Sequence, residues 1–411
     1  MTLEVLKGCS DSLPAEQIQI NRILDIIRNN FEKYGFRPFD TPTIEYLDVL
    51  ARKYDEDAEI VQEIFKVTDR GNRKLGLRYD LTTPLSRYVA SQKQLKLPFR
   101  RYAIGKVFRD GPIKKGRVRE FIQCDGDVIG ITGIEIEAEI LEMFFNTYKE
   151  LGIDVVIEVN NNKILRGALL QENFKEKELD SLILSIDKLK KIGLKGVLDE
   201  IKGKGLETKR AENAIKILQS KDFKEIKKLA KSELLKEGIA ELEELTNLLN
   251  SLKVVFRVNF SMSRGLAIYS GNIWEAYEKD ERVTSSIGAG GRFDKIIGEY
   301  SGDGREFPAV GVSFGLVPIL ACLNEEKREG TAEILVVPLS EGLTKDALKL
   351  ANKLRKKENV EICYDYKLKK AFSYAQYLGI QKIAILGEKD KEQGVYTLKD
   401  IDSGKEEKVK L

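Results

Sequence analysis

Polar and apolar residues alternate with a period of two along residues 117–128. The odd positions are mostly polar, at Arg117, Arg119, Gln123, Asp125 and Asp127. The even positions are mostly apolar, at Val118, Ile122, Cys124 and Val128. Alternation of this kind predicts a β-strand with one face on the core and the other facing something polar.

A turn precedes this strand and joins it to a strand-like run from Arg101 to Arg109. The connecting residues 110–116 contain turn-forming Gly and Pro residues, together with Lys114 and Lys115. Both lysines must stay solvated or meet an anion, so the segment predicts a β-hairpin with a cationic tip. A solvated sheet face is the alternative, but three arginines beside two aspartates favour a ligand site.

Helical patterns surround the hairpin. Residues 15–34 and 134–151 each predict a helix, and the second has acidic residues at helical spacing, which are typical of a solvated face. From residue 161 to 252 the composition shifts to Lys, Glu and Leu, and one apolar face repeats at Leu242, Leu245, Leu248 and Leu249. This segment predicts an inserted α-helical subdomain, and strands resume from Val254 to about Cys322.

The last part of the chain alternates short apolar runs with helical patterns. The charged residues 324–330 indicate a linker. Strands are expected at Ile334–Pro338, Val360–Ile362 and Lys382–Leu386, with a helix at Thr344–Lys357. This order predicts a small, mostly parallel α/β domain.

Composition places the chain among soluble globular proteins. Its 411 residues suggest two or three domains, and 42% of them are hydrophobic while 33% are charged. No apolar run approaches the ~18 residues of a membrane helix, and residues 1–14 have no signal-peptide core. We therefore expect a cytoplasmic protein. The net charge of +3 leaves any contact with nucleic acid to local basic patches.

The chain contains no histidine, which excludes a Ser-His-Asp triad, a histidine general base and histidine metal ligands. Its four cysteines are scattered without a C-x-x-C pair, so neither zinc nor a metal site of another kind is expected. Chemistry must therefore use carboxylates, arginines and bound ions. Compositional drift and selection for synthesis without histidine both remain possible reasons for the absence.

The hairpin carries a resemblance to a known family. Residues 108–121 are similar to motif 2 of class II aminoacyl-tRNA synthetases, and residues 123–130 resemble its histidyl version. Other segments resemble further signatures of that family in the family order: residues 34–42 (motif 1), 77–84 (amino-acid binding), 264–271 and 288–294 (the two histidyl signatures), and 308–316 (motif 3).

The resemblance to histidyl-tRNA synthetases implies a fold of mixed class, α/β with an α+β catalytic core. It implies an antiparallel class II sheet flanked by helices over residues 1–160 and 253–323. A helical insertion is expected over residues 161–252, and an α/β domain like the anticodon-binding domain over residues 331–411. Motif 1 implies a homodimer.

The implied function is ATP-dependent attachment of histidine to tRNA(His) through a histidyl-adenylate, with Mg²⁺ accompanying the ATP and with no zinc. The implied partners are histidine, ATP and tRNA(His), and no membrane. The alternative is a catalytically impaired paralogue that senses histidine or binds RNA as a regulator. A non-catalytic relative usually lacks the C-terminal domain, so its presence favours the ligase.

Residue roles follow from the alignment with the family pattern. The amino-acid-binding residues would be Asp80, Thr82, Gln123, Asp127 and Tyr269. Among them Asp127 and Tyr269 would read the imidazole ring, because a carboxylate accepts one ring N–H and a tyrosyl group serves the other nitrogen. The catalytic residues would be Arg109 and Arg264, and ATP would be bound by Arg109, Arg117 and Arg119, since arginine binds oxygen pairs bidentately.

Two positions depart from the family pattern. Gly111 stands where many relatives carry a glutamate near adenine, and the neighbouring Asp110 is a candidate replacement. Pro318 stands where motif 3 supplies an ATP-binding arginine. Loss of one such donor costs about a hundred- to a thousandfold in rate, unless another cation such as Arg292, Lys114 or Lys115 compensates.

Overall fold

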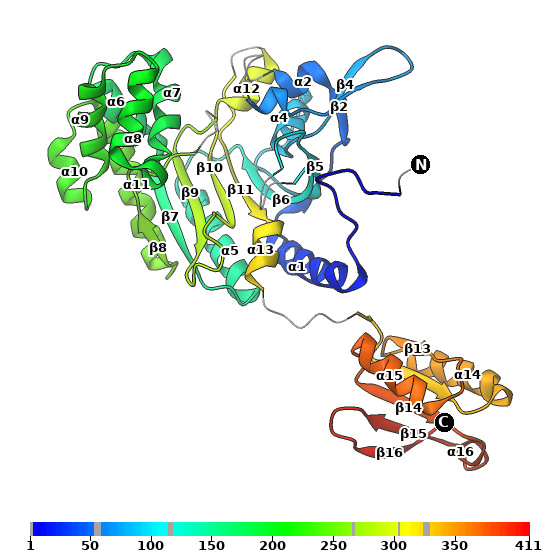
Figure 1. Ribbon diagram of the computed structural model, residues 1–411. Helices are drawn as coiled ribbons and strands as arrows, with labels where there is room; N and C mark the ends of the chain where they lie inside the picture. The colour runs from blue at the N-terminus through cyan, green and yellow to red at the C-terminus, as the bar shows by residue number, and fades with distance from the viewer. Residues whose placement is uncertain (1–2, 53–58, 114–117, 265–267, 303–304, 324–328) are drawn as a thin grey trace. The chain divides into compact units, whose positions relative to one another are not determined.

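A computed structural model describes residues 3–52, 59–113, 118–264, 268–302, 305–323 and 329–411 (Figure 1). The chain divides into two compact units. The first comprises Met1–Ser10 and Ile23–Asn324, and the second comprises Asp11–Arg22 and Glu325–Leu411. No helix of the described residues is long and apolar enough to cross a membrane.

The first unit is built on an eight-stranded sheet in the order β1-β5-β6-β11-β10-β9-β7-β8. Its two outer pairs, β1 with β5 and β7 with β8, are parallel, and the other neighbours are antiparallel. The largely antiparallel core predicted from the sequence is therefore confirmed. The strands are β1 (Arg37–Pro38), β5 (Phe99–Phe108), β6 (Glu120–Ile129), β7 (Val155–Asn161), β8 (Phe256–Val258), β9 (Asn272–Glu278), β10 (Gly288–Arg292) and β11 (Ala309–Gly315).

Helices α1 (Pro14–Lys33) and α5 (Glu135–Glu150) match the two helices predicted near them, and an aromatic cluster joins both to the sheet. Phe31 of α1 stacks on Tyr102 with ring centroids 5.4 Å apart, and Phe314 lies 5.7 Å from Phe31 and 4.8 Å from Phe144. Gly126 permits this packing, because a Cβ there would lie 2.3 Å from the Phe31 ring. This face of β6 is thus closed by aromatic residues, and its polar face lies on the other side.

A smaller three-stranded sheet in the order β2-β4-β3 belongs to the same unit. Short helices accompany the two sheets, and α4 brings the residues after Asp80 close to β5. The bounds are β2 (Ile44–Tyr46), α2 (Leu47–Ala51), α3 (Glu59–Gln62), β3 (Lys66–Thr68), β4 (Lys74–Leu77), α4 (Thr82–Ser91), α12 (Ile296–Ser301) and α13 (Leu316–Cys322).

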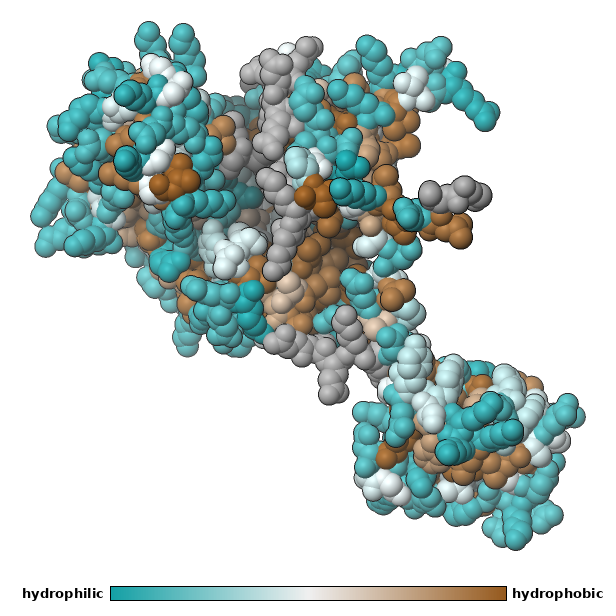
Figure 2. All heavy atoms as spheres, viewed as in Figure 1, coloured by the Kyte–Doolittle hydropathy of each residue, from teal (hydrophilic) through white to brown (hydrophobic). Residues whose placement is uncertain are grey.

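The segment between β7 and β8 is entirely helical, as the sequence predicts. The green helices of Figure 1 pack through a buried apolar face that includes Leu242, Leu245 and Leu249. Gly167 lets two helices approach closely, since a Cβ there would lie 2.5 Å from the Leu235 backbone nitrogen. Figure 2 shows mainly hydrophilic residues on the outer surface of this subdomain. The helices are α6 (Asn162–Gln171), α7 (Glu176–Ile186), α8 (Leu189–Gly203), α9 (Thr208–Leu218), α10 (Phe223–Leu229) and α11 (Glu233–Ser251).

The second unit contains a five-stranded sheet in the order β13-β12-β14-β15-β16. Strands β12, β13 and β14 are parallel and have the predicted bounds, and α14 begins at the predicted Thr344. The sequence did not predict the antiparallel strands β15 and β16, which are rich in charged residues and lie at the sheet edge. The elements are β12 (Ile334–Pro338), η1 (Glu341–Leu343), α14 (Thr344–Leu354), β13 (Val360–Ile362), α15 (Leu368–Leu378), β14 (Lys382–Leu386), α16 (Glu388–Glu392), β15 (Val395–Asp400) and β16 (Glu406–Lys410). The predicted linker lies mostly outside the described residues.

Candidate active site

The polar face of β6 lies in the middle of the large sheet. On β5, Arg101 is directly opposite Asp127, and on β11 Gly311 is opposite the same aspartate. A Cβ at Gly311 would lie 2.0 Å from an Asp127 carboxylate oxygen, so the glycine makes room for this side chain. Asp125 lies opposite Ser313 of β11. The sheet register therefore gathers acidic, basic and hydroxyl groups on one face.

A small cavity of about 40 Å³ opens on this face. Three of the predicted amino-acid-binding residues, Thr82, Asp127 and Tyr269, line it together. Asp125 and Ser313 complete its polar lining. Asp125 is 4% exposed, and the sequence analysis placed it on the polar face without giving it a role. Asp125 lies two residues before Asp127, on the same face of the strand, and this spacing was the signal that could have identified it.

Arg101 lies under the cavity and was not predicted. Its side chain is completely buried, and its Nη2 lies 2.5 Å from Asp127 Oδ2 and donates to the Leu81 carbonyl at 3.2 Å. Its Nε and Nη1 have no hydrogen-bond partner. A buried arginine with two open donors beside a carboxylate indicates a polar site rather than a packed core.

Burial dominates the ionisation of the two aspartates. It raises the pKa of Asp125 to about 7, while the Arg101 charge opposes the shift and the Asp127 charge adds to it. Burial likewise raises the pKa of Asp127 to about 6 against the effect of Arg101. Asp80 raises both values further. The cavity therefore favours a ligand that brings positive charge or a proton.

Asp80 and Gln123 do not line this cavity, but each lies near residues that do. The Thr83 backbone N–H donates to Asp80 Oδ1 at 2.8 Å, which holds the carboxylate at the start of α4. Gln123 Nε2 is 3.5 Å from Ser313 Oγ, and its buried Oε1 has no partner. Both predicted residues are thus close to Asp125 and Asp127.

Tyr269 lines the small cavity, and Arg264 lies against its ring. The Arg264 guanidinium carbon lies 5.2 Å from the centroid of the Tyr269 ring, and its Nη1 donates to the Trp274 carbonyl at 3.4 Å. Burial raises the pKa of Tyr269, so its hydroxyl stays protonated and can donate as well as accept. Residues 265–267 of this predicted signature lie outside the described residues.

Arg109 and Arg119 continue the site along the hairpin. Arg109 Nε donates to the Tyr79 carbonyl at 3.2 Å, and its guanidinium carbon lies 5.0 Å from the Phe121 ring centroid. Arg119 pairs with Asp110 at 2.9 Å. Its backbone carbonyl accepts from the Arg109 N–H at 2.9 Å. The predicted ATP-binding residue Arg117 lies outside the described residues, as do Lys114 and Lys115.

A carboxylate that the sequence analysis missed lies beside Gly111. A Cβ at Gly111 would be 2.4 Å from Glu63 Oε1, and the Glu63 carbonyl accepts from the Asp110 N–H at 2.7 Å. Glu63 therefore places an acidic group where a side chain at position 111 would start. Asp110, the candidate replacement, is paired with Arg119. No pattern near Glu63 in the sequence signals this placement.

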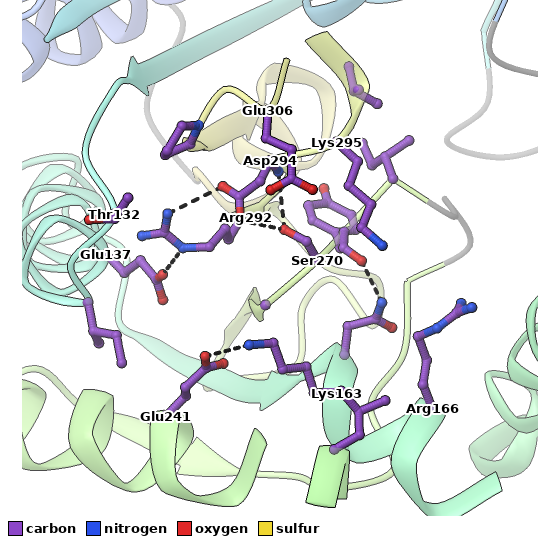
Figure 3. A pocket seen from close by; sticks show the side chains of 18 of the residues that line it. Thr132, Glu137, Lys163, Arg166, Glu241, Ser270, Arg292, Asp294, Lys295 and Glu306 are labelled. Atoms are coloured by element: carbon purple, nitrogen blue, oxygen red, sulfur yellow. Dashed lines mark hydrogen bonds and ion pairs between the residues drawn. The ribbon is translucent and has the colours of Figure 1, made fainter. Parts of the chain in front are cut away.

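A larger cavity of about 570 Å³ lies between α6, α11 and the residues that follow Ile268 (Figure 3). It shares Ile268 and Tyr269 with the small cavity. Two of its cations are held by carboxylates: Lys163 pairs with Glu237 and Glu241, and Arg166 pairs with Glu176 and Asp180. Among the described residues no group of His, Cys, Asp and Glu side chains is arranged to hold a metal ion.

Arg292 belongs to this larger cavity. Its Nε donates to the buried Glu137 at 2.5 Å, and its other nitrogens donate to Asp294 and to the Gly133 carbonyl. Pro318, in contrast, lies in the first turn of α13 and packs against Gly315. Arg292, one of the candidate cations that could compensate for Pro318, is therefore held by Glu137 in this structure.

Known proteins resemble the chain over its full length. A histidyl-tRNA synthetase family model matches residues 8–319, and an anticodon binding domain model matches residues 333–411. Histidine–tRNA ligase 1 of Bacillus cereus is 38% identical over 100% of this chain and 96% of its own length. The histidine–tRNA ligase of Clostridium tetani is 35% identical over 99% and 96%.

Solved structures agree with these matches. The crystal structure of histidyl-tRNA synthetase from Nostoc sp. PCC 7120 superposes with a TM-score of 0.87 at 28% identity, covering 100% of this chain and 97% of that one. The family resemblance expected from motif order is confirmed. The chain belongs to the histidyl-tRNA synthetase family.

Proposed function

We propose that the protein attaches histidine to tRNA(His) in two steps, through a histidyl-adenylate made from histidine and ATP. The observation that carries the proposal is the full-length family match together with the gathering of Thr82, Asp127 and Tyr269 around one small polar cavity. In the first step the histidine carboxylate attacks the α-phosphorus and pyrophosphate leaves. In the second, a terminal ribose hydroxyl of the tRNA takes the histidyl group.

The small cavity would hold the amino acid. Asp127 accepts a ring N–H, and Tyr269 contacts the ring from the opposite wall. Asp80, Thr82 and Gln123 bind the α-ammonium, because together they offer a carboxylate, a hydroxyl and an amide oxygen beside the ring pocket. The unpartnered Oε1 of Gln123 supports this role, since a buried acceptor without a donor is completed by a ligand.

The arginines would neutralise the phosphate and carboxylate charges. Arg264 lies against the ring of Tyr269, which lines the cavity, and Arg109 donates to the carbonyl of Tyr79, the residue before Asp80. Arg117 and Arg119 would bind ATP, with Glu63 as the acidic group beside Gly111 that the adenine amino group requires. Mg²⁺ would enter with ATP as part of the nucleotide substrate. Because Arg292 is held by Glu137, we propose that Arg292 does not replace the motif 3 arginine that is missing at Pro318.

Residues 1–160 and 253–323 would form the catalytic core, 161–252 the insertion at the acceptor arm and 331–411 the anticodon-binding domain. We also propose a cytoplasmic homodimer. The β2-β4-β3 sheet supports a protein partner, since it exposes Ile44, Tyr46 and Val67. Nothing in the fold or the comparisons favours the regulatory paralogue.

Histidine-dependent exchange of labelled pyrophosphate into ATP tests the first step. The expected result is exchange that saturates with histidine and is absent with other amino acids. Charging of tRNA(His) by the same preparation tests the second step. Tight histidine binding without exchange would contradict the proposal and favour a sensor.

A further inference from the structure

The cavity contains one more carboxylate than the proposed contacts use. Asp125 is 4% exposed, lines the cavity beside Asp127, and has a buried Oδ1 without a hydrogen-bond partner. Asp127 already has the Arg101 guanidinium at 2.5 Å. A buried carboxylate oxygen without a donor is costly in the free protein, so a ligand donor is the natural partner.

The charges that face Asp125 leave it without a full counter-ion. From β5 it faces Arg101, from β6 Asp127 and the neutral Gln123, and from β11 the Ser313 hydroxyl. Asp80 at the start of α4 adds negative charge. From the Tyr269 wall come the phenol itself and, behind it, Arg264 and Glu275.

A bound histidine would use part of this set. Its ammonium would pair with Asp80, and its carboxylate with Arg264 and Arg109. Two aspartates and one arginine then remain around the ring, and their net charge is −1. The raised pKa of Asp125 agrees with a site that lacks positive charge.

The spacing of the two aspartates suits the two sides of an imidazole ring. Residues two apart on a strand are about 6.8 Å apart on the same face. Two N–H···O bonds of about 2.8 Å, pointing away from opposite sides of a ring about 2 Å across, place their acceptors about 7 Å apart. Asp125 and Asp127 can therefore each accept from one ring nitrogen.

We propose that Asp125 is a second specificity-determining contact to the imidazole, and that the site binds the ring as an imidazolium with Asp125 and Asp127 each accepting one N–H. This inference rests on the proposed function. A neutral imidazole has one donor and one acceptor nitrogen, whereas two ionised carboxylates offer acceptors only. Both ring N–H groups are then taken by the aspartates, so Tyr269 packs against the ring from the opposite wall without accepting from it.

Proton counting tests the ring's charge. Histidine is titrated into the full-length protein by calorimetry at pH 8 in two buffers that differ in ionisation enthalpy. The free ring is neutral at this pH, since its pKa is about 6.5. We expect wild-type protein to take up about one proton per histidine. Asp125→Asn should take up none, and its histidine affinity should be about 10- to 100-fold weaker.

A second measurement separates a protonated ring from a protonated Asp125. The probe is 1,2,4-triazolylalanine, whose ring has the shape of imidazole but is far less basic. Wild-type protein should prefer histidine to this analogue, and Asp125→Asn should reduce that preference by about tenfold or more. An unchanged preference would overturn the imidazolium, even if protons are taken up.

The matched control is Asp180→Asn, which makes the same substitution in the larger cavity, where the aspartate pairs with Arg166. It should take up protons as the wild type does. Equal proton uptake by wild type and Asp125→Asn would overturn this inference. Histidine-dependent pyrophosphate exchange without proton uptake would overturn the imidazolium inference and leave the proposed function intact. Absence of histidine-dependent exchange would contradict the proposed function. The melting temperature of Asp125→Asn verifies that the variant is folded.

Discussion

The two cavities beside Tyr269 differ in how their polar atoms are partnered. The larger one is about 570 Å³, yet Lys163, Arg166 and Arg292 each contact two carboxylates there. The smaller one is about 40 Å³ and is surrounded by buried donors and acceptors without partners. Unsatisfied buried polar atoms, rather than volume, thus mark the position where a ligand completes the structure.

Removing the negative charge of Asp127 should have the largest effect. Asp127→Asn removes the negative charge of the carboxylate proposed to accept the ring N–H, keeps only one acceptor oxygen, and leaves Arg101 beside a neutral amide. The kcat/KM for histidine in pyrophosphate exchange should fall by about 10⁴-fold, because a site built on buried polar groups strongly disfavours an unmatched partner. Steady-state exchange kinetics measure the loss. Asp180→Asn in the larger cavity is the control and should stay within about twofold of wild type.

Truncating Arg264 should have the next largest effect, on the rate rather than on folding. Arg264→Ala removes the charge that we propose meets the reacting carboxylate and phosphate, which should lower exchange by about 10²- to 10³-fold. Arg257→Ala is the matched control, because Arg257 is largely exposed and its partner Glu158 keeps Lys190 and Asn259. Full exchange activity in Arg264→Ala at an unchanged melting temperature would refute the assigned role.

These two predictions differ in how far the sequence alone could support them. Period-two alternation predicted the face that carries Asp127, and the family resemblance predicted that Asp127 and Tyr269 belong to one binding site. Arg101 could not be predicted, because Arg100 and Arg101 are adjacent in an apolar run and point to opposite faces. Arg100 pairs with Glu139 of α5, and Arg101 pairs with Asp127. Only the register of β5 on β6 distinguishes them.

The same limit applies to the larger cavity. The sequence predicts a solvated acidic face of α5 at Glu135, Glu139 and Glu142. It assigns nothing to Glu137, which is 1% exposed and pairs with Arg292. The two residues are far apart in the sequence and meet only when β10 joins the sheet. Local patterns therefore predict the strands and helices well, whereas they do not predict the ion pairs that depend on long-range packing.

Glu137→Gln should disrupt the Glu137–Arg292 ion pair in the larger cavity without impairing histidine binding in the smaller one. Glu137 accepts from Arg292 Nε at 2.5 Å and from Asn272 Nδ2 at 2.6 Å, so the glutamine amide nitrogen must face one of these donors. Breaking a buried pair costs about 3–5 kcal/mol, and thermal unfolding should show a melting temperature lower by roughly 10 °C. The KM for histidine should change less than about threefold. A large rise in that KM at normal stability would show that both cavities bind substrate.

The pH dependence of stability should give the smallest effect. Because the pKa of Asp125 is raised to about 7 and that of Asp127 to about 6, the folded protein holds protons that the unfolded chain has released. The stabilisation of the folded protein by these two protonated carboxyl groups is complete below about pH 4 and is lost as the pH rises through 6 and 7. The Asp125→Asn variant has no carboxyl group at this position, so it does not lose this part of the stabilisation as the pH rises. The melting temperature of this variant relative to wild type should therefore rise by a few degrees between pH 5 and pH 8 without ligand. Saturating histidine should cancel this gain, since an imidazolium supplies the missing charge. A pH-independent difference between the two proteins would mean that Asp125 does not titrate in this range and that its charge is balanced within the free cavity.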